Sequence, residues 1–416
     1  MKNLFKLTFA LCAFAVAVTA TSCGDDDSNS VSGTVVTFTA DGSIDGSDVL
    51  EDYADNVVTA RYATLAAKSK ALYEAVQAID NDGVSEVTTM SAACDAWKAA
   101  RVAWERTEAY LFGPVDDYGI DPGIDSWPLD LASIAESIVD YSSGSVSEDD
   151  IQSDGGDLKG FHAIEFLLFN DGSDKTSLTD WDTTYTTDYG LSALSKDQVK
   201  TYLKAITKEL YRCTTLLVAE WGNVTLAVDL DYIDVSSYVS DGDYYTTFTT
   251  AGDSSNSKFK SVEVALSTII EAAGGIADEV GSVKIADPIK SGNVLDVESW
   301  FSHNSVTDFT NNIVGIKEAY YGVQYADDYF SDATRYDEPA ANSISAYIKS
   351  GDSNLDLIIK SAIDYAIASV NNMQAPFRNY LTWTSQNKAA ANSCADLLDA
   401  LETAQGAIND GYYLLY

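Results

Sequence analysis

The sequence predicts an all-α protein made of two helical-bundle halves, and three observations lead to this fold class. Apolar residues recur near the 3.6-residue helical period through several long segments. The chain has six prolines among 416 residues, so few positions would interrupt a helix. Short apolar strands do not alternate with helices, as they would in a parallel β-sheet fold.

The first 22 residues are expected to be a lipoprotein signal peptide and not part of the fold. They contain Lys2 and Lys6, continue through an apolar stretch at 7–18, and end in small residues before Cys23. The apolar stretch is shorter than the ~20 residues that a membrane-spanning helix needs. Cleavage before Cys23 would leave an acylated N-terminal cysteine, whereas an ordinary signal peptidase site nearby would leave a free N-terminus.

Composition divides the remaining chain into four regions. Residues 23–45 are rich in Ser, Gly, Thr and Asp, which is typical of a flexible tether. An N-terminal bundle is predicted at 46–225 and a C-terminal bundle at 257–416, with a polar connecting loop at 226–256. Any strands are expected within 226–256 and the similar stretch 171–190. Helices are expected at 49–79, 87–112, 160–169 and 195–221, and then at 262–280, 306–321, 355–373 and 389–408.

Local signals support several of these boundaries. Gly113 and Pro114 directly follow the second helical segment and would end it. Ser195 stands at the start of the fourth segment, where its side chain can cap the helix. The segment 160–169 is apolar nearly all round, as a buried helix would be.

A short repeated pattern suggests that the two halves are related by duplication. Residues 104–113 read WERTEAYLFG, and residues 315–322 read GIKEAYYG. Both end a predicted helix with Glu, Ala, Tyr, an aromatic or aliphatic residue, and Gly. Two related bundles would explain the pattern.

The strong negative charge of the chain limits its partners. The sequence has 64 acidic and 25 basic residues, a formal net charge of −39. Such a field repels phosphate backbones, so no nucleic-acid partner is expected. The acidity serves either solubility outside the cytoplasm or the attraction of cations.

Three segments carry side chains suited to holding a cation in a bundle core. The first reads RVAWERTEAYLFGPV, the second DYGIDPGIDSWPLD and the third GFHAIE. On a helix, residues three apart share a face, so the Glu pair of the first segment and the His/Glu pair of the third each project together. Glu-x-x-His spacing serves di-iron bundles in the same way. The candidate residues are Arg101, Glu105, Glu108, Asp121, Asp125, His162 and Glu165.

The apolar surroundings of His162 and Glu165 allow two interpretations. A carboxylate among large apolar side chains is destabilised by desolvation unless a cation or hydrogen-bond donors offset the cost. A metal ion could be that cation. Arg101 could also fill the role, which would make the group a structural ion pair with no ligand.

The order of these segments, followed by ESWFSHNSVTDFTNNIVGIKEAYYG, resembles the imelysin family over roughly residues 47 to 410. The family's GxHxxE signature matches Gly160, His162 and Glu165. The resemblance implies an all-helical fold of two related bundles with the signature near their contact. It implies metal ligands at His162, Glu165, Glu105, Glu108 and Asp125. Residues expected to line the site are Arg101, Asp121, Trp127, Ser302 and His303.

The expected function is metal binding, with iron as the expected metal and zinc or another divalent cation as alternatives. The resemblance implies a protein of iron uptake in the envelope of a Gram-negative bacterium, working with envelope transport partners. The lipid would anchor it to the outer membrane, on the periplasmic or the outer face.

Two other functions remain open. The first is a metal-dependent peptidase with Glu165 or Glu105 as general base. Zinc peptidases usually carry HExxH, and this chain has only two histidines, His162 and His303. The second is binding of an organic ligand or partner between the halves, where Trp127 and Trp300 would provide contacts.

Lipid anchoring can be tested directly on the mature N-terminus. Mass spectrometry of the purified protein should find a chain that begins at Cys23 and carries acyl groups. The Cys23→Ala protein should be released from the membrane fraction, because it lacks the acylated residue. An unmodified N-terminus at another residue would contradict the prediction.

Overall fold

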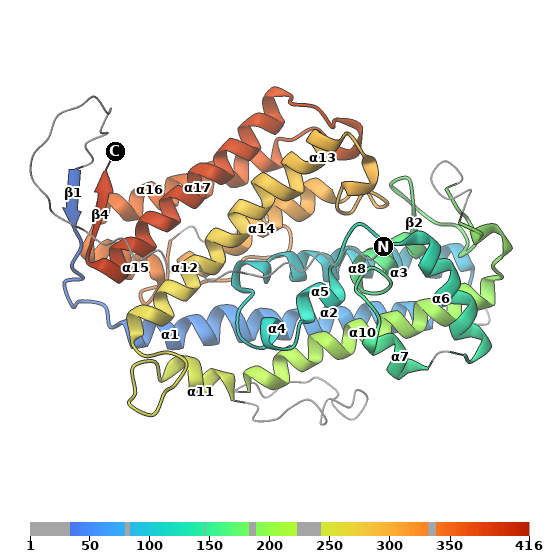
Figure 1. Cartoon of the computed structure of the whole chain (residues 1–416), viewed down its shortest axis with the longest axis horizontal. Coiled ribbons are helices and arrows are strands. Elements are labelled where there is room, and N and C mark those ends of the chain that lie inside the picture. The colour runs from blue at the N-terminus through green and yellow to red at the C-terminus, as the bar shows by residue number, and fades with distance from the viewer. Residues whose placement is uncertain are drawn as a thin grey trace, which may run out of the picture.

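The computed structural model describes residues 34–79, 84–145, 147–182, 189–222, 243–331 and 338–415. The predicted signal peptide, Cys23, the start of the tether and residues 226–242 of the predicted connecting loop lie outside them. Helices dominate the described chain and its strands are short, so the all-α prediction is confirmed (Figure 1). Within these ranges no helix combines the length and the apolar character that a membrane span requires.

The N-terminal half is arranged around three long helical segments. The first consists of α1 (Gly46–Tyr53), a π-helical segment (Ala54–Thr59) and α2 (Ala60–Gln77). It packs against α3 (Glu86–Glu105) and α10 (Lys196–Trp221). The shorter helices pack on α10 and are α4 (Pro114–Asp117), α5 (Ile120–Ile124), α6 (Leu131–Ser143), α7 (Glu148–Ser153) and α8 (Gly160–Leu168). Ser195 caps α10, as the sequence predicts, and Gln198 completes a capping box with it.

The C-terminal half is a second group of packed helices, drawn yellow to red in Figure 1. Its α12 (Val262–Asp278) continues through a π-helical segment (Glu279–Ile285) into α13 (Ala286–Ser291). Both α12 and α16 pack on α17. The other helices of this half are α14 (Ser305–Tyr321), α15 (Ile344–Gly351), α16 (Ser353–Asn371) and α17 (Ser385–Asp410). Helix α11 (Tyr244–Thr249) precedes them in the chain and packs on α1 and α10 of the N-terminal half. Helix α11 occupies part of the predicted connecting loop.

Two small antiparallel pairs of strands complete the fold. Strand β2 (Phe169–Asn170) pairs with β3 (Ser173–Asp174), next to the end of α8. Strand β1 (Thr34–Thr37) pairs with β4 (Tyr412–Leu415). The prediction that strands would be confined to the polar stretches was therefore wrong for β4 and for β1, which lies within the predicted flexible tether. It was also wrong for β2, which begins two residues before the stretch 171–190. The β-forming residues of β1 and β4 are distant in sequence, and only the pairing of the two segments fixes the structure.

The second long helix ends earlier than the sequence predicts, at Glu105 and not near residue 112. The Thr107 hydroxyl donates to Trp104 O at 2.7 Å, and a short 3₁₀ turn, Glu108–Tyr110, follows. Glu105 and Glu108 thus lie on successive elements instead of on one continuous helix. Both side chains still reach the same buried region, because Asn312 donates a hydrogen bond to each.

The two halves meet where α14 crosses the end of α3 and the 3₁₀ turn. A Cβ atom at Gly315 of α14 would lie 2.5 Å from Arg106 O, so only glycine permits this approach. Glu318, further along α14, accepts hydrogen bonds from Arg61 Nε at 3.1 Å and Arg106 Nη1 at 3.1 Å. Close backbone contact and a buried ion cluster therefore hold α14 against the N-terminal half.

The Gly315→Ala variant tests this close contact. The added methyl group must displace the Arg106 backbone, so the free energy of unfolding should fall by roughly 1–3 kcal/mol. Gly406→Ala in α17 is the matched control, because a Cβ there meets nothing within 4 Å. That variant should gain about 0.5–1 kcal/mol from helix propensity. Urea unfolding measures both, and equal effects of the two substitutions would contradict the packing.

Candidate metal centre

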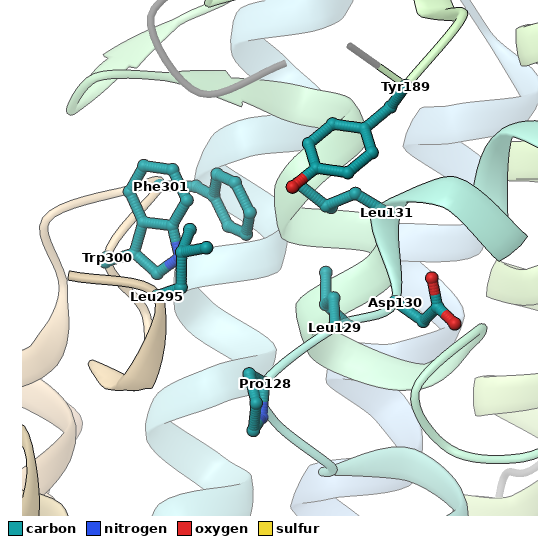
Figure 2. Close-up of a pocket in the computed structure, with 8 residues that line it drawn as sticks. All are labelled: Pro128, Leu129, Asp130, Leu131, Tyr189, Leu295, Trp300 and Phe301. Carbon is teal, nitrogen blue, oxygen red and sulfur yellow. The ribbon is translucent and has the colours of Figure 1, made fainter. Parts of the chain in front are cut away.

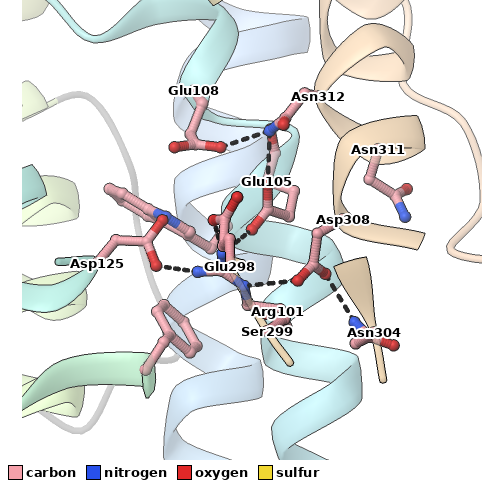
Figure 3. Close-up of polar contacts among 12 residues, drawn as sticks. Arg101, Glu105, Glu108, Asp125, Glu298, Ser299, Asn304, Asp308, Asn311 and Asn312 are labelled. Atoms are coloured by element: carbon pink, nitrogen blue, oxygen red, sulfur yellow. Dashed lines mark hydrogen bonds and ion pairs between the residues drawn. The ribbon is translucent and has the colours of Figure 1, made fainter. Parts of the chain in front are cut away.

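A group of buried polar side chains, here called the central cluster, lies where the two halves meet (Figure 3). Helices α3 and α8, the 3₁₀ turn and the loop after α5 carry its N-terminal members. The π-helical segment after α12, the loop before α14 and α14 itself carry the others. Its members are Arg101, Glu105, Glu108, Asp125, His162 and Glu165 from the N-terminal half, and Lys284, Glu298, Asp308 and Asn312 from the C-terminal half.

Arg101 lies at the centre of the cluster and is fully buried. Its guanidinium forms close ion pairs with Glu105, Asp125 and Glu298, and Nε lies 3.2 Å from Asp308 Oδ2. Burial alone would lower the pKa of Arg101, but the four carboxylates hold it well above its usual value. Arg101 therefore stays charged and joins carboxylates from both halves.

Glu165 fixes the orientation of the His162 ring. His162 Nδ1 lies 3.0 Å from Glu165 Oε2. The other oxygen, Glu165 Oε1, accepts hydrogen bonds from Ser302 N at 2.8 Å and Ser302 Oγ at 2.7 Å. Both carboxylate oxygens are thus engaged, and His162 Nε2 is turned toward the rest of the cluster.

His162 Nε2 faces two carboxylates. It lies 3.1 Å from Asp125 Oδ1 and 3.7 Å from Glu298 Oε1, but it makes no hydrogen bond of normal geometry to any described residue. If Nδ1 donates to Glu165, a neutral ring presents the Nε2 lone pair to negative oxygens. That arrangement is favourable only with a proton or a metal ion between them.

In the metal-free protein, the surroundings of His162 favour a proton on the ring. Burial and Arg101 both act to lower the pKa of His162. The nearby carboxylates of Asp125, Glu165 and Glu298 outweigh them and raise this pKa well above its usual value. A metal ion could take the place of the Nε2 proton, since metal binding requires the neutral imidazole.

Lys284 is the second fixed cation of the cluster and is fully buried. Its Nζ lies 3.1 Å from Glu108 Oε2, 3.2 Å from Glu298 Oε2 and 3.8 Å from Glu105 Oε2. It also lies 5.3 Å from the centre of the Trp127 ring. The ammonium thus forms ion pairs with carboxylates from both halves.

Negative charge still exceeds positive charge in the cluster, even with His162 protonated, because six carboxylates face three cationic groups. Burial raises the pKa of Glu105 and of Glu108, and raises that of Asp308 to about 7 although Arg101 opposes it. Asp125 and Glu298 differ, because neighbouring cations overcome burial and lower the pKa of both carboxyls. Burial among like charges therefore favours the protonated forms of Glu105, Glu108 and Asp308, and a bound cation would favour their ionised forms.

Two sets of three residues have donor atoms close enough to share a metal ion. One is Asp125, His162 and Glu298, and the other is Glu105, Glu108 and Asp125. In each set the donor atoms lie within 4.8 Å of one another. The first set offers one imidazole nitrogen and carboxylate oxygens, which suit iron, manganese or zinc. The residues present therefore fit a divalent cation.

The structure brings most of the sequence-predicted residues together. His162, Glu165, Glu105, Glu108, Asp125 and Arg101 all belong to the cluster. The Trp127 and His162 ring centres lie 6.0 Å apart, and Asp121 is half-buried with its pKa raised by burial and nearby carboxylates. Ser302 contacts Glu165, as described. His303 differs, because its Nε2 pairs with Asp171 Oδ1 at 3.1 Å at the edge of the site, and its side chain is 25% exposed.

Sequence reasoning missed the four cluster members of the C-terminal half. Glu298, Asp308 and Asn312 lie inside the segment that carried the family resemblance, but their spacing matches no ligand motif. Lys284 had a usable signal, because it stands in the largely apolar stretch VGSVKIADPI. A lone lysine in such a stretch indicates a buried ion pair.

A pocket of about 270 Å³ is lined mainly by the chain segments that follow Asp125 and flank Glu298 (Figure 2). Trp300 and Phe301, just before Ser302, form part of its wall. Leu129, Leu131 and Tyr189 of the N-terminal half form another part. The pocket is therefore lined by both halves and is rich in aromatic side chains.

Comparison with known proteins gives consistent results. The family model for imelysin matches residues 49–405. Iron-regulated protein A of Synechococcus elongatus is 26% identical over 276 residues, which cover 66% of this chain and 64% of that relative, less than two thirds of its length.

Solved structures are also similar. The crystal structure of a protein assigned as an iron-regulated protein A precursor, from Parabacteroides distasonis, is 30% identical with a TM-score of 0.71. The match covers 89% of this chain and 97% of that one. An imelysin-like protein from Psychrobacter arcticum is 12% identical with a TM-score of 0.56, over 86% of this chain and 95% of that one, and so supports the fold alone.

The pKa of Asp308 predicts how the stability of the metal-free protein depends on pH. Its folded value of about 7 lies above the ordinary value of 3.8. Protonated Asp308 thus contributes stability that is fully present below about pH 4 and is lost as the pH rises through 7, up to roughly 4 kcal/mol. Urea unfolding from pH 4 to 8 should show this loss in the wild type and a smaller loss in Asp308→Asn. Equal slopes in the two proteins would contradict the assignment.

Proposed function

The chain belongs to the imelysin family, and we propose that it binds a single divalent metal ion, foremost iron, where its two halves meet. The ligands are His162 Nε2 and carboxylate oxygens of Asp125 and Glu298. Arg101 keeps the carboxylates in place and reduces their net charge. Glu165 is a positioning residue, because its two oxygens hold the His162 ring and the Ser302 backbone.

The observation that carries the proposal is the environment of His162 Nε2. This buried nitrogen faces Asp125 and Glu298 without a hydrogen bond of normal geometry in the described part of the chain. A structural ion pair with Arg101 alone would not need an imidazole at this point. A metal ion would accept the Nε2 lone pair and neutralise both carboxylates.

Iron uptake in the cell envelope is the proposed role. Two similar proteins bear the name iron-regulated protein A, which supports iron as the metal. Mixed nitrogen and oxygen donors are compatible with iron, although zinc also accepts them. The predicted lipoprotein signal supports attachment to the outer membrane, where the protein would pass metal to envelope transport partners.

Peptidase activity has less support. Glu105 and Glu165, the two candidate general bases, are both fully buried. Glu105 accepts a hydrogen bond from Asn312, and Glu165 accepts two from Ser302. A carboxylate engaged in this way is poorly placed to take a proton from an attacking water.

Organic-ligand binding is the second candidate function, and the pocket shown in Figure 2 favours it. Aromatic and aliphatic side chains from both halves line this space of about 270 Å³. Such a lining suits a small aromatic or apolar group. In that case Trp300 fluorescence should change on binding, and Trp300→Ala should weaken binding without changing metal content.

Metal binding is tested by titrating iron(II) under anaerobic conditions, and zinc in parallel, into metal-free protein. The wild type should bind one ion. His162→Ala should weaken binding by about 100-fold or more, and Glu165→Gln by roughly 10–100-fold, as expected for a residue that orients a ligand. His303→Ala is the matched control and should bind like the wild type, because His303 pairs with Asp171 outside the cluster.

The stability of the metal-free wild type and of metal-free His162→Ala distinguishes a metal site from a structural ion pair. Loss of a partner from a purely structural buried pair should destabilise the metal-free protein by ~3–5 kcal/mol. Loss of a ligand should cost less, because the metal-free cluster is already crowded with carboxylates. Marked destabilisation of metal-free His162→Ala, together with no metal binding by the wild type, would refute the proposal.

A further inference from the structure

Lys284 occupies an unusual place for a lysine. Its side chain is fully buried, and its ammonium lies among carboxylates of Glu108, Glu298 and Glu105 at 3.1 to 3.8 Å. It belongs to the π-helical segment Glu279–Ile285 that separates α12 from α13. π-Helical turns are rare and frequently mark functional sites.

We propose that Lys284 is a built-in cation that blocks a second metal position, formed by Glu105, Glu108 and Asp125, and so limits the centre to one metal ion. The inference rests on the proposed function, because it takes the first position to be the one with His162. It makes Lys284 the residue that determines metal stoichiometry. Removal of its charge would open a carboxylate-only site.

The geometry of the second set supports a metal position. Glu105, Glu108 and Asp125 each offer an oxygen, and these atoms lie within 4.8 Å of one another. Small side-chain movements would bring all three oxygens to one ion, at the oxygen–metal distances of about 2.0–2.6 Å that such ions prefer. Asp125 also belongs to the first set, so it could bridge two ions, as carboxylates do in two-metal sites.

Lys284 and a second metal ion would compete for the same oxygens. The ammonium is within ion-pair distance of Glu105 and Glu108, two of the three residues in the second set. A divalent ion there would share these carboxylates with a like charge at close range in a buried site. The ammonium and a second metal ion therefore exclude each other. In this structure Lys284 is the counter-charge of Glu105 and Glu108.

Asn312 provides an independent sign that this position suits a ligand. It is fully buried, and its Nδ2 donates to Glu105 Oε2 at 2.6 Å and closely to Glu108 (Figure 3). Its Oδ1 has no hydrogen-bond partner among the residues that the structure describes. Rotation of the amide would exchange Nδ2 for Oδ1 and supply a further oxygen to a metal ion.

The test is the number of manganese(II) ions bound per chain, measured by calorimetric titration and by elemental analysis after desalting. The wild type should bind one ion and Lys284→Met two. Adding Glu108→Gln to Lys284→Met should return the number to one, because the second position loses a ligand. Lys317→Met is the matched control and should keep one ion, since Lys317 is a buried lysine of α14 that pairs with Asp364.

The outcomes separate this inference from the proposed function. Two ions in the wild type, or one ion in folded Lys284→Met, would overturn the role of Lys284 and leave a metal site at His162. No ion in the wild type would overturn the proposed function. In that case Lys284 retains its role only if Lys284→Met gains an ion that Glu108→Gln removes.

A folding defect in Lys284→Met would also be informative. Without the ammonium, Glu105, Glu108 and Glu298 lose a shared counter-charge, so the metal-free variant should unfold at a lower temperature than the wild type. Manganese(II) should raise its unfolding temperature by more than it raises that of the wild type. An equal or smaller increase in the variant would contradict the inference, and Lys284→Gln repeats the comparison with a polar side chain.

Discussion

The burial of Arg101 among carboxylates from both halves is the constraint on which the rest of the structure depends. A guanidinium at this depth must be paired, and its partners Glu105, Asp125, Glu298 and Asp308 come from four different elements. Removing one partner from a buried pair typically destabilises a protein by 3–5 kcal/mol. The same interactions that join the halves therefore hold the side chains of the candidate metal centre in position. The second buried cluster, Glu318 with Arg61 and Arg106, repeats this joining role further along α14.

The excess of carboxylates in the central cluster relates this constraint to function. A core built only for stability would match its buried charges, because unpaired charge is costly in an apolar interior. Here the pKa of His162, Glu105, Glu108 and Asp308 is raised, which favours their protonated forms and lowers the negative charge of the metal-free cluster. Protons held in this way can be exchanged for a cation, so binding should release protons and depend on pH.

Much of the fold could be predicted from the sequence because helical periodicity and capping are local. The helix cap at Ser195 and the apolar run of α8 are examples. The prediction failed where tertiary contacts decide the outcome. Helix α3 ends at Glu105, where α14 approaches closely at Gly315, and β1 exists only through pairing with β4. Half of the site was predictable because its residues also form local sequence patterns. The residues at α3 and α8 lie in compact motifs, whereas Glu298 and Lys284 reach the cluster through the packing of the second half, which no local spacing reveals.

The central claim is that His162 Nε2 binds a metal ion together with carboxylate oxygens. X-ray absorption at the iron edge of the reconstituted protein tests it most directly, since the imidazole ring gives a distinct scattering pattern. The account predicts a first shell of mainly oxygen with the contribution of one histidine, and loss of that histidine pattern in His162→Ala. A shell of oxygen alone in the wild type would contradict it.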